Sequence, residues 1–211
     1  MNASLAAARE LVRAYHEEVH PVAEDELDRM LGLGSESQAV ASSYDASVEQ
    51  VHAGESVVYL ATPYPVCRAL FRALWLGEGD LVVDLGCGTG RLVLYGSLCT
   101  PARFVGVELI ADRWAVARAA TQRLALERTE VVLGNAVDWD FGAGTVFYLF
   151  RPFSSATEAT VVARLHAEAR RRAITVAAYR LLPGLFDDGV FDLEVMGDLR
   201  LYRSAAQTGG R

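Results

Sequence analysis

Residues 81–91 read LVVDLGCGTGR, and this stretch decides the fold. A short apolar run rich in β-branched residues ends in a carboxylate, and three glycines at alternate positions precede a helix-compatible segment. The pattern predicts a buried strand, a tight loop and the first turn of a helix. Glycine allows a ligand to approach the main chain closely, and the helix start offers N–H donors to an anion. We therefore expect a ligand site at the end of this strand.

Two carboxylates are placed regularly around the loop. Asp84 lies two residues before Gly86, and Glu108 ends the next apolar run, RFVGVE, twenty residues after Gly88. An acidic residue at that distance binds ribose hydroxyls in nucleoside-binding β-α-β units. The glycine spacing is G-x-G-x-G, and Arg91 stands where the dinucleotide fingerprint G-x-G-x-x-G has its third glycine.

The run VVDLGCGTGR, followed by FVGVE, resembles the S-adenosylmethionine site of the class I methyltransferases. The resemblance implies that the loop cradles the methionine part of the cofactor, that Glu108 holds two ribose hydroxyls and that Asp84 lies near the ammonium. It also implies an adenine site at Asn135, where the family usually has aspartate; an amide oxygen can still accept the hydrogen bond. S-adenosyl-L-methionine is the expected cofactor and S-adenosyl-L-homocysteine the expected product. The expected cofactor-binding residues are Asp84, Gly86, Cys87, Gly88, Gly90, Glu108, Leu109, Asn135, Ala136, Tyr59 and Thr62.

A second resemblance precedes the glycine loop. The pattern Tyr-x-x-Thr-Pro, formed by Tyr59, Thr62 and Pro63, followed by a helix and the D-x-G-x-G loop, is similar to the non-SET histone lysine methyltransferases and related protein-lysine methyltransferases. In those proteins this segment lines the methionine end of the cofactor, which makes Tyr59 and Thr62 candidates here. From the residues alone, Thr62 can equally cap a helix whose first position is Pro63.

Hydrophobic patterning predicts seven strands with interleaved helices. The fold class is therefore α/β: a Rossmann-like, doubly wound, seven-stranded and mostly parallel sheet with a C-terminal antiparallel hairpin. Residues 1–54 are expected to form an N-terminal helical extension and residues 55–211 the methyltransferase core domain. The extension is either a lid, a dimerisation arm of a homodimer, or a segment packed against the core. The serine-rich stretch 35–47, which contains Tyr44, is either a lid or a plain linker.

The residues on the acceptor side identify their ligand less specifically than the glycine loop does. The strand at 145–150 is followed by Arg151-Pro152-Phe153, and ligands of parallel sheets lie beyond the carboxyl ends of the strands. We expect Phe150, Arg151, Phe153 and Tyr44 to line the substrate, and no catalytic residue is assigned. A guanidinium beside a sulfonium and an amine acceptor opposes amine methylation. Either Arg151 binds a carboxylate, or the acceptor is oxygen or carbon.

Composition narrows the function classes. With 211 residues and a net charge of −7, the chain suits one domain and argues against a nucleic-acid substrate. Its three cysteines form no CxxC pair, which indicates a reducing cytoplasm. No metal-ligand motif, secretion signal or membrane-spanning apolar run is expected. Three functions are left open: methylation of a protein side chain, methylation of a small molecule, and non-catalytic binding of S-adenosylmethionine by a partner or sensor protein.

Overall fold

The computed structural model describes residues 3–34, 60–150, 153, 155–181, 184–186 and 189–205. Tyr44, Tyr59, Arg151 and the expected boundary at residues 54–55 lie outside these ranges. The described helices are α1 (Ala3–Glu17), α2 (Glu24–Leu31), α5 (Tyr64–Ala73), α6 (Arg91–Cys99), α7 (Ala111–Leu124) and α8 (Ser155–Arg171), with single 3-10 turns η1 (Ala136–Asp138) and η2 (Phe141–Ala143). The strands are β1 (Leu81–Leu85), β2 (Arg103–Glu108), β3 (Thr129–Leu133), β4 (Val146–Leu149), β5 (Thr175–Tyr179), β6 (Phe191–Met196) and β7 (Leu199–Ser204).

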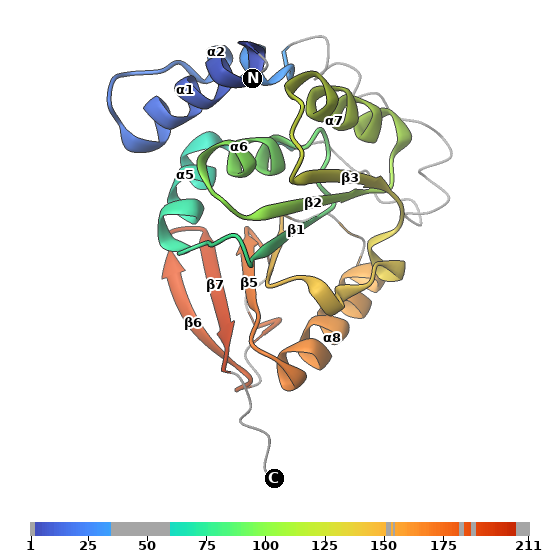
Figure 1. Ribbon diagram of the computed structural model, residues 1–211. Helices are drawn as coiled ribbons and strands as arrows, with labels where there is room; N and C mark the ends of the chain where they lie inside the picture. Colours follow the sequence, from blue (N-terminus) through green and yellow to red (C-terminus); the bar gives the residue numbers. More distant parts are fainter. Residues whose placement is uncertain are drawn as a thin grey trace.

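The strands form one seven-stranded sheet in the order β3-β2-β1-β4-β5-β7-β6 (Figure 1). Strands β1 to β5 pair in parallel, whereas β7 pairs antiparallel with both β5 and β6. The predicted fold class is confirmed, including the C-terminal hairpin. The chain runs outward from β1 in both directions, so the point where the order reverses lies between β1 and β4. Open α/β sheets bind their ligands at this switch point, beyond the carboxyl ends of the strands.

Helices cover both faces of the sheet, so each face has its own apolar core. One core combines buried side chains of α1, α2, α5 and α6 with β1, including Val12, Leu27 and Leu70. The other lies beneath α8 and includes Val161, Leu165 and Phe147. The two cores explain why β1 and β4 are buried along their whole length.

Helices α1 and α2 pack directly on this fold, and α1 lies along α6 (Figure 1). Three tyrosines join them: the ring of Tyr15 in α1 lies 6.1 Å from that of Tyr64 and 6.2 Å from that of Tyr95, centroid to centroid. Gly32 ends α2 in the left-handed conformation, at φ +78°, as its place after Leu31 predicts. Within the described residues, no helix is long and apolar enough to cross a membrane.

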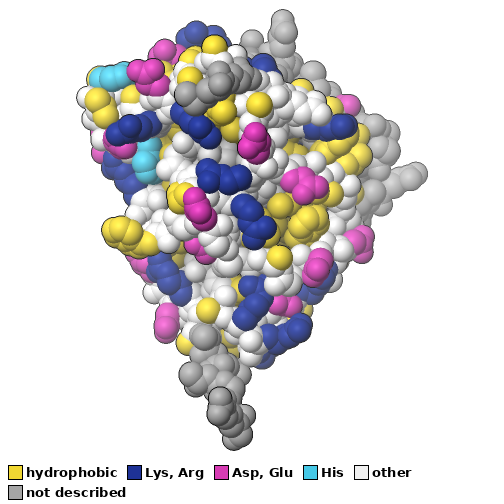
Figure 2. All heavy atoms as spheres, in the orientation of Figure 1, with side chains coloured by type: hydrophobic (Ala, Val, Ile, Leu, Met, Phe, Trp, Pro, Cys, Tyr) yellow, Lys and Arg dark blue, Asp and Glu magenta, His cyan; other side chains and the backbone are white. Residues whose placement is uncertain are grey.

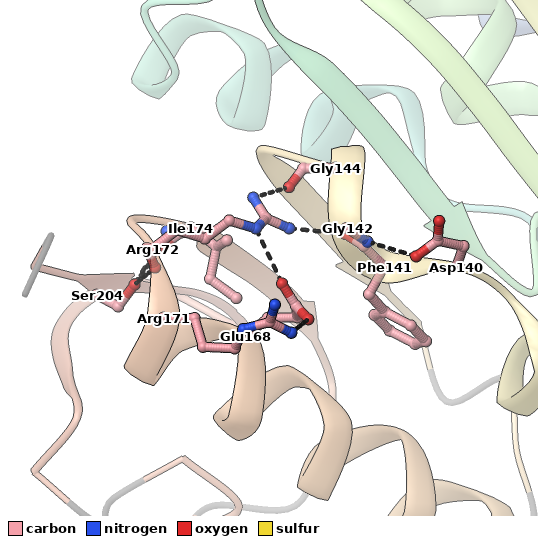
Figure 3. Close-up of polar contacts among 9 residues, drawn as sticks. All are labelled: Asp140, Phe141, Gly142, Gly144, Glu168, Arg171, Arg172, Ile174 and Ser204. Atoms are coloured by element: carbon pink, nitrogen blue, oxygen red, sulfur yellow. Dashed lines mark hydrogen bonds and ion pairs between the residues drawn. The ribbon is translucent and has the colours of Figure 1, made fainter.

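Arg172, just after α8, holds the amino ends of β4 and β5 together (Figure 3). Its guanidinium donates to the carbonyl oxygens of Gly144 at 2.5 Å and Phe141 at 2.6 Å, and to the Glu168 carboxylate at 2.9 Å. Just before β5, the N–H of Ile174 donates a hydrogen bond to the hydroxyl of Ser204, the last residue of β7, at 2.9 Å. These contacts fix strand register at the sheet edge opposite the ligand edge.

Candidate cofactor site

The glycine loop continues the pairing of β1 and β2 before it turns into α6. The backbone N–H groups of Gly86 and Cys87 both donate to the Val107 carbonyl, at 2.8 and 3.0 Å. Gly86, Gly88 and Gly90 have φ values of +84°, +57° and +81°, which non-glycine residues rarely adopt. The loop therefore crosses the carboxyl end of β1 in a conformation that favours glycine, as the G-x-G-x-G pattern predicts; Gly86 is exposed, whereas Gly88 and Gly90 are buried.

Cys87 is a packing residue of this loop. A Cβ on Gly106 of β2 would lie 2.7 Å from the Cys87 sulfur, so the strand glycine makes room for the thiol. Burial raises the pKa of the Cys87 thiol well above its ordinary value, and the nearby Asp84 and Glu108 add to this effect. The neutral thiol is a poor nucleophile, which argues against covalent chemistry at this position.

Glu108 ends β2, and its side chain holds the glycine loop through a hydrogen bond. Its two carboxylate oxygens accept the N–H of Gly88 at 2.7 Å and the N–H of Ile110 at 2.9 Å, and the residue is only 5% exposed. Burial raises the pKa of Glu108, while these hydrogen bonds and the nearby Arg113 act in the opposite direction. Because each carboxylate oxygen can accept a further hydrogen bond, Glu108 can hold a vicinal diol without releasing the loop.

Asp84 is a buried carboxyl at the end of β1 that makes no hydrogen bond to another described residue. It is 4% exposed and pairs in register with Gly106 of β2 and Tyr148 of β4. Burial, with a smaller contribution from Glu108, raises the pKa of Asp84 to about 8. A buried carboxylate is costly unless a cation or donors compensate it. Asp84 therefore fits a ligand that carries an ammonium group.

Thr62 lies against β4 and does not cap the following helix. Its hydroxyl is 3.0 Å from the Tyr148 hydroxyl, and both side chains are buried. Helix α5 begins at Tyr64, so Pro63 occupies the N-cap position, which has no side-chain cap. The expectation that Pro63 is the first helical residue, capped by Thr62, is wrong, because the Thr62 hydroxyl is directed to Tyr148.

Asn135 follows β3 and shapes the turn where adenine is expected. It is the N-cap of η1, and its side-chain oxygen accepts the Val137 N–H at 3.1 Å. The next residue, Ala136, is buried, and Leu109 is half-buried directly after Glu108. Glu108 pairs in register with Leu133, so these residues lie at adjacent strand ends. The amide oxygen has a second acceptor position for an exocyclic amine.

Aromatic side chains line the other half of the sheet edge. Phe150, directly after β4, is half-buried, and its ring centroid lies 4.8 Å from that of Tyr179 at the end of β5. Phe153 is half-buried against the core beneath α8. Sequence reasoning overlooked Tyr148 and Tyr179. The period-two alternation that places Tyr148 on the same side of the strand as Phe150 could have identified the former.

The structure thus brings the loop, Asp84, Glu108, Asn135 and Phe150 to one edge of one sheet. Across the described ranges, no group of three or more His, Cys, Asp or Glu side chains could hold a metal ion.

Comparison with known proteins agrees with this arrangement. Residues 82–172 match the family described as a methyltransferase domain. The chain is 31% identical over 96 residues to a protein-lysine N-methyltransferase of Saccharolobus islandicus (strain REY15A), which covers 44% of this chain. The match spans 60% of the length of that relative.

Two solved structures show the same fold. An RNA methyltransferase of Salinibacter ruber, in complex with S-adenosyl-L-homocysteine, has a TM-score of 0.57 and 20% identity, over 72% of this chain and 97% of that chain. Precorrin-6y C5,15-methyltransferase of Geobacter metallireducens GS-15 has a TM-score of 0.57 and 12% identity, over 72% and 93% of the two chains. Over residues 82–172 the chain is thus similar to a methyltransferase domain, and its sheet order and glycine loop agree with the fold of the class I S-adenosylmethionine-dependent methyltransferases.

Proposed function

We propose that this protein transfers a methyl group from S-adenosyl-L-methionine to a side chain of another protein, with a lysine amine as the acceptor. The observation that carries the cofactor assignment is the pair of buried carboxylates, Asp84 and Glu108, on either side of a glycine loop with positive φ values. The acceptor assignment rests on the similarity to the protein-lysine N-methyltransferase and on the aromatic side chains at the ends of β4 and β5.

Each part of the cofactor has a matching group at the sheet edge. Asp84 would accept a hydrogen bond from the ammonium group. Glu108 would accept hydrogen bonds from the ribose hydroxyls while it still accepts the one from the Gly88 N–H. Asn135, Ala136 and Leu109 would hold the adenine. Gly86, Cys87, Gly88 and Gly90 would bind the methionine part beside Thr62, and Tyr59, which lies outside the described residues, remains a predicted contact at that end. The bound cofactor supplies an electrophilic methyl group.

The protein's contribution to the reaction is alignment and exclusion of water. Phe150 and Tyr179 pack against each other at the carboxyl ends of β4 and β5, where the acceptor is proposed to bind, and aromatic rings attract cationic groups such as an alkylated ammonium. The lysine ammonium must lose its proton to solvent before the transfer, because only the neutral amine carries the lone pair that attacks the methyl group. Phe153 is a described member of the proposed acceptor lining, whereas Tyr44 and Arg151 lie outside the described residues and remain predicted members, Arg151 as a group that would bind a carboxylate.

A nucleic-acid acceptor fits less well. The chain carries a net charge of −7, and acidic and basic side chains are interspersed on the face seen in Figure 2. A phosphate backbone is bound by clusters of positive charge.

Titration calorimetry with S-adenosylmethionine and S-adenosylhomocysteine tests the cofactor assignment. We expect micromolar binding of both, and a loss of binding of at least tenfold in Glu108→Ala. Glu130→Ala is the matched control, because Glu130 is an exposed carboxylate on the neighbouring strand β3. If the wild-type protein binds neither compound, the proposed function is wrong.

Tritium-labelled S-adenosylmethionine with a cell lysate tests the acceptor. Lysine methylation predicts label in protein, recovered as methyl-lysine after acid hydrolysis. The sequence contains no lysine, so labelled methyl-lysine cannot arise from automethylation of this chain. Label in low-molecular-weight material would instead assign a small-molecule acceptor. Cofactor binding without any transfer would favour a sensor or partner protein.

We also propose a cytoplasmic location, since Cys67, Cys87 and Cys99 are free thiols. The division into an extension at residues 1–54 and a core at 55–211, and the homodimer, remain predictions.

A further inference from the structure

Arg91, the first residue of α6, is held by two separate segments of the chain, helix α2 and residues 62–64. Its guanidinium donates to the Asp28 carboxylate of α2 at 2.7 Å and to the Thr62 carbonyl at 3.3 Å. It also lies over the Tyr64 ring of α5, 4.7 Å from the centroid. The Tyr64 hydroxyl in turn donates to the other Asp28 oxygen at 2.7 Å.

This cluster, Asp28, Thr62, Tyr64 and Arg91, is shielded from solvent. The side chains of Asp28 and Arg91 are each 12% exposed, and Thr62 and Tyr64 are buried. Helix α2 is fixed in place beneath it by Leu27 and Leu31, which are fully buried. Burial and the nearby Asp28 carboxylate raise the pKa of Tyr64, so its hydroxyl stays a donor. The geometry of the cluster is therefore set by the N-terminal helices.

The cluster contacts the two segments that the proposed function assigns to the methionine end of the site, the glycine loop and the Thr62 segment. Arg91 directly follows Gly90, the last glycine of the loop, and its contact with the Thr62 carbonyl fixes the segment opposite the loop. The Thr62 hydroxyl is also hydrogen-bonded to the Tyr148 hydroxyl. Tyr148 of β4 is the register partner of Asp84 in β1. A shift of Arg91 would thus change the distance between the loop and the Thr62 segment.

We propose that Asp28 is a positioning residue for the methionine end of the cofactor, and that the N-terminal helices are part of the cofactor site through the Asp28–Arg91 pair. This inference rests on the proposed function. A planar guanidinium can contact a carboxylate and a carbonyl at once, whereas an isolated charge at this depth would turn away toward water. Asp28 keeps Arg91 in place against Thr62.

The test compares two ligands that differ only in whether they carry the amino-acid part of the cofactor. S-adenosylhomocysteine contains the amino-acid part, whereas 5′-methylthioadenosine lacks it and keeps the adenosine that Glu108 and Asn135 would hold. In Asp28→Asn, calorimetry should show at least fivefold weaker binding of S-adenosylhomocysteine and an unchanged affinity, within twofold, for 5′-methylthioadenosine. Asp25→Asn is the control on the same helix, because Asp25 is exposed and pairs with Arg29 of that helix at 3.6 Å.

A purely structural role predicts another pattern. Equal weakening of both ligands in Asp28→Asn, or no weakening of either, overturns the inference while the wild-type affinities still support the proposed function. If the wild-type protein binds neither ligand, it is the proposed function that fails. Should Asp28→Asn not fold, Arg91→Lys decides, because lysine keeps the charge but cannot hold Asp28 and Thr62 together. The same ligand selectivity is expected there, and its absence refutes the role of the pair.

Discussion

Binding of the cofactor should release a proton from Asp84. Burial raises the pKa of this carboxyl from an ordinary value of 3.8 to about 8, so in the ligand-free protein at pH 7 it is about 90% protonated. An ammonium placed beside it favours the carboxylate and lowers its pKa. We therefore expect about 0.9 proton to leave per bound S-adenosylhomocysteine at pH 7, and the apparent affinity to rise about ninefold from pH 6 to pH 7.

Calorimetry in buffers of different ionisation enthalpy measures this proton directly. At pH 7, the observed enthalpy in phosphate and in Tris should differ by about 0.9 times the difference between their ionisation enthalpies. Asp84→Asn should bind more weakly and lose the buffer dependence. Identical enthalpies for the wild-type protein in both buffers would refute the reasoning, as would a buffer dependence that survives in Asp84→Asn.

The same carboxyl affects the stability of the ligand-free protein. Because its folded pKa lies above the unfolded one, its contribution is complete below about pH 4 and is lost as the pH rises to about 8. The shift of about four pH units sets an upper limit of about 5–6 kcal/mol. Hydration of the ionised Asp84 carboxylate makes the actual loss of stability smaller than this limit. At pH 9 we therefore expect Asp84→Asn to unfold at least about 5 °C above the wild-type protein. Near pH 4 the two proteins should unfold at the same temperature. Equal melting temperatures at pH 9 would contradict a buried, uncompensated Asp84.

Three further predictions concern packing. Gly106→Ala should destabilise the fold by about 2 kcal/mol in urea unfolding, because its Cβ would lie 2.7 Å from the Cys87 sulfur, and Cys87→Ala in the same chain should restore part of the loss. Arg172→Met should cost about 2–3 kcal/mol, since Glu168 and the carbonyls of Gly144 and Phe141 lose their common donor; Arg171→Met, at an exposed site, is the control. Burial raises the pKa of all three cysteine thiols, so a thiol reagent at pH 8 should label the native protein slowly and the urea-unfolded protein completely; fast labelling of native Cys87 would argue against its packed position.

The sequence predicted the parts of this protein that depend on local pattern. The strand, loop and helix at residues 81–91, the carboxylate at Glu108 and the seven strands follow from periodicity and glycine placement, which act over a few residues. The Asp28–Arg91 pair and the Thr62–Tyr148 contact join residues 63 and 86 positions apart, and no periodicity marks such partners. Thr62 illustrates the difference: its position before Pro63 predicted a cap locally, but its tertiary partner decided where the hydroxyl points.

The insertion of β7 between β5 and β6 has a consequence for synthesis on the ribosome. Until residues 199–204 are available, β5 has an open edge, because its outer neighbour is β7, the last of the described strands. Near the N-terminus, the apolar side of α1 stays uncovered until Tyr95 and the rest of α6, some eighty residues later in the sequence, have been synthesised. Strand β5 and helix α1 thus both find partners far away in the sequence, and chains with such non-local contacts fold slowly. A nascent chain that stops before Leu199 should therefore remain a target for chaperones and proteases instead of forming a smaller stable domain.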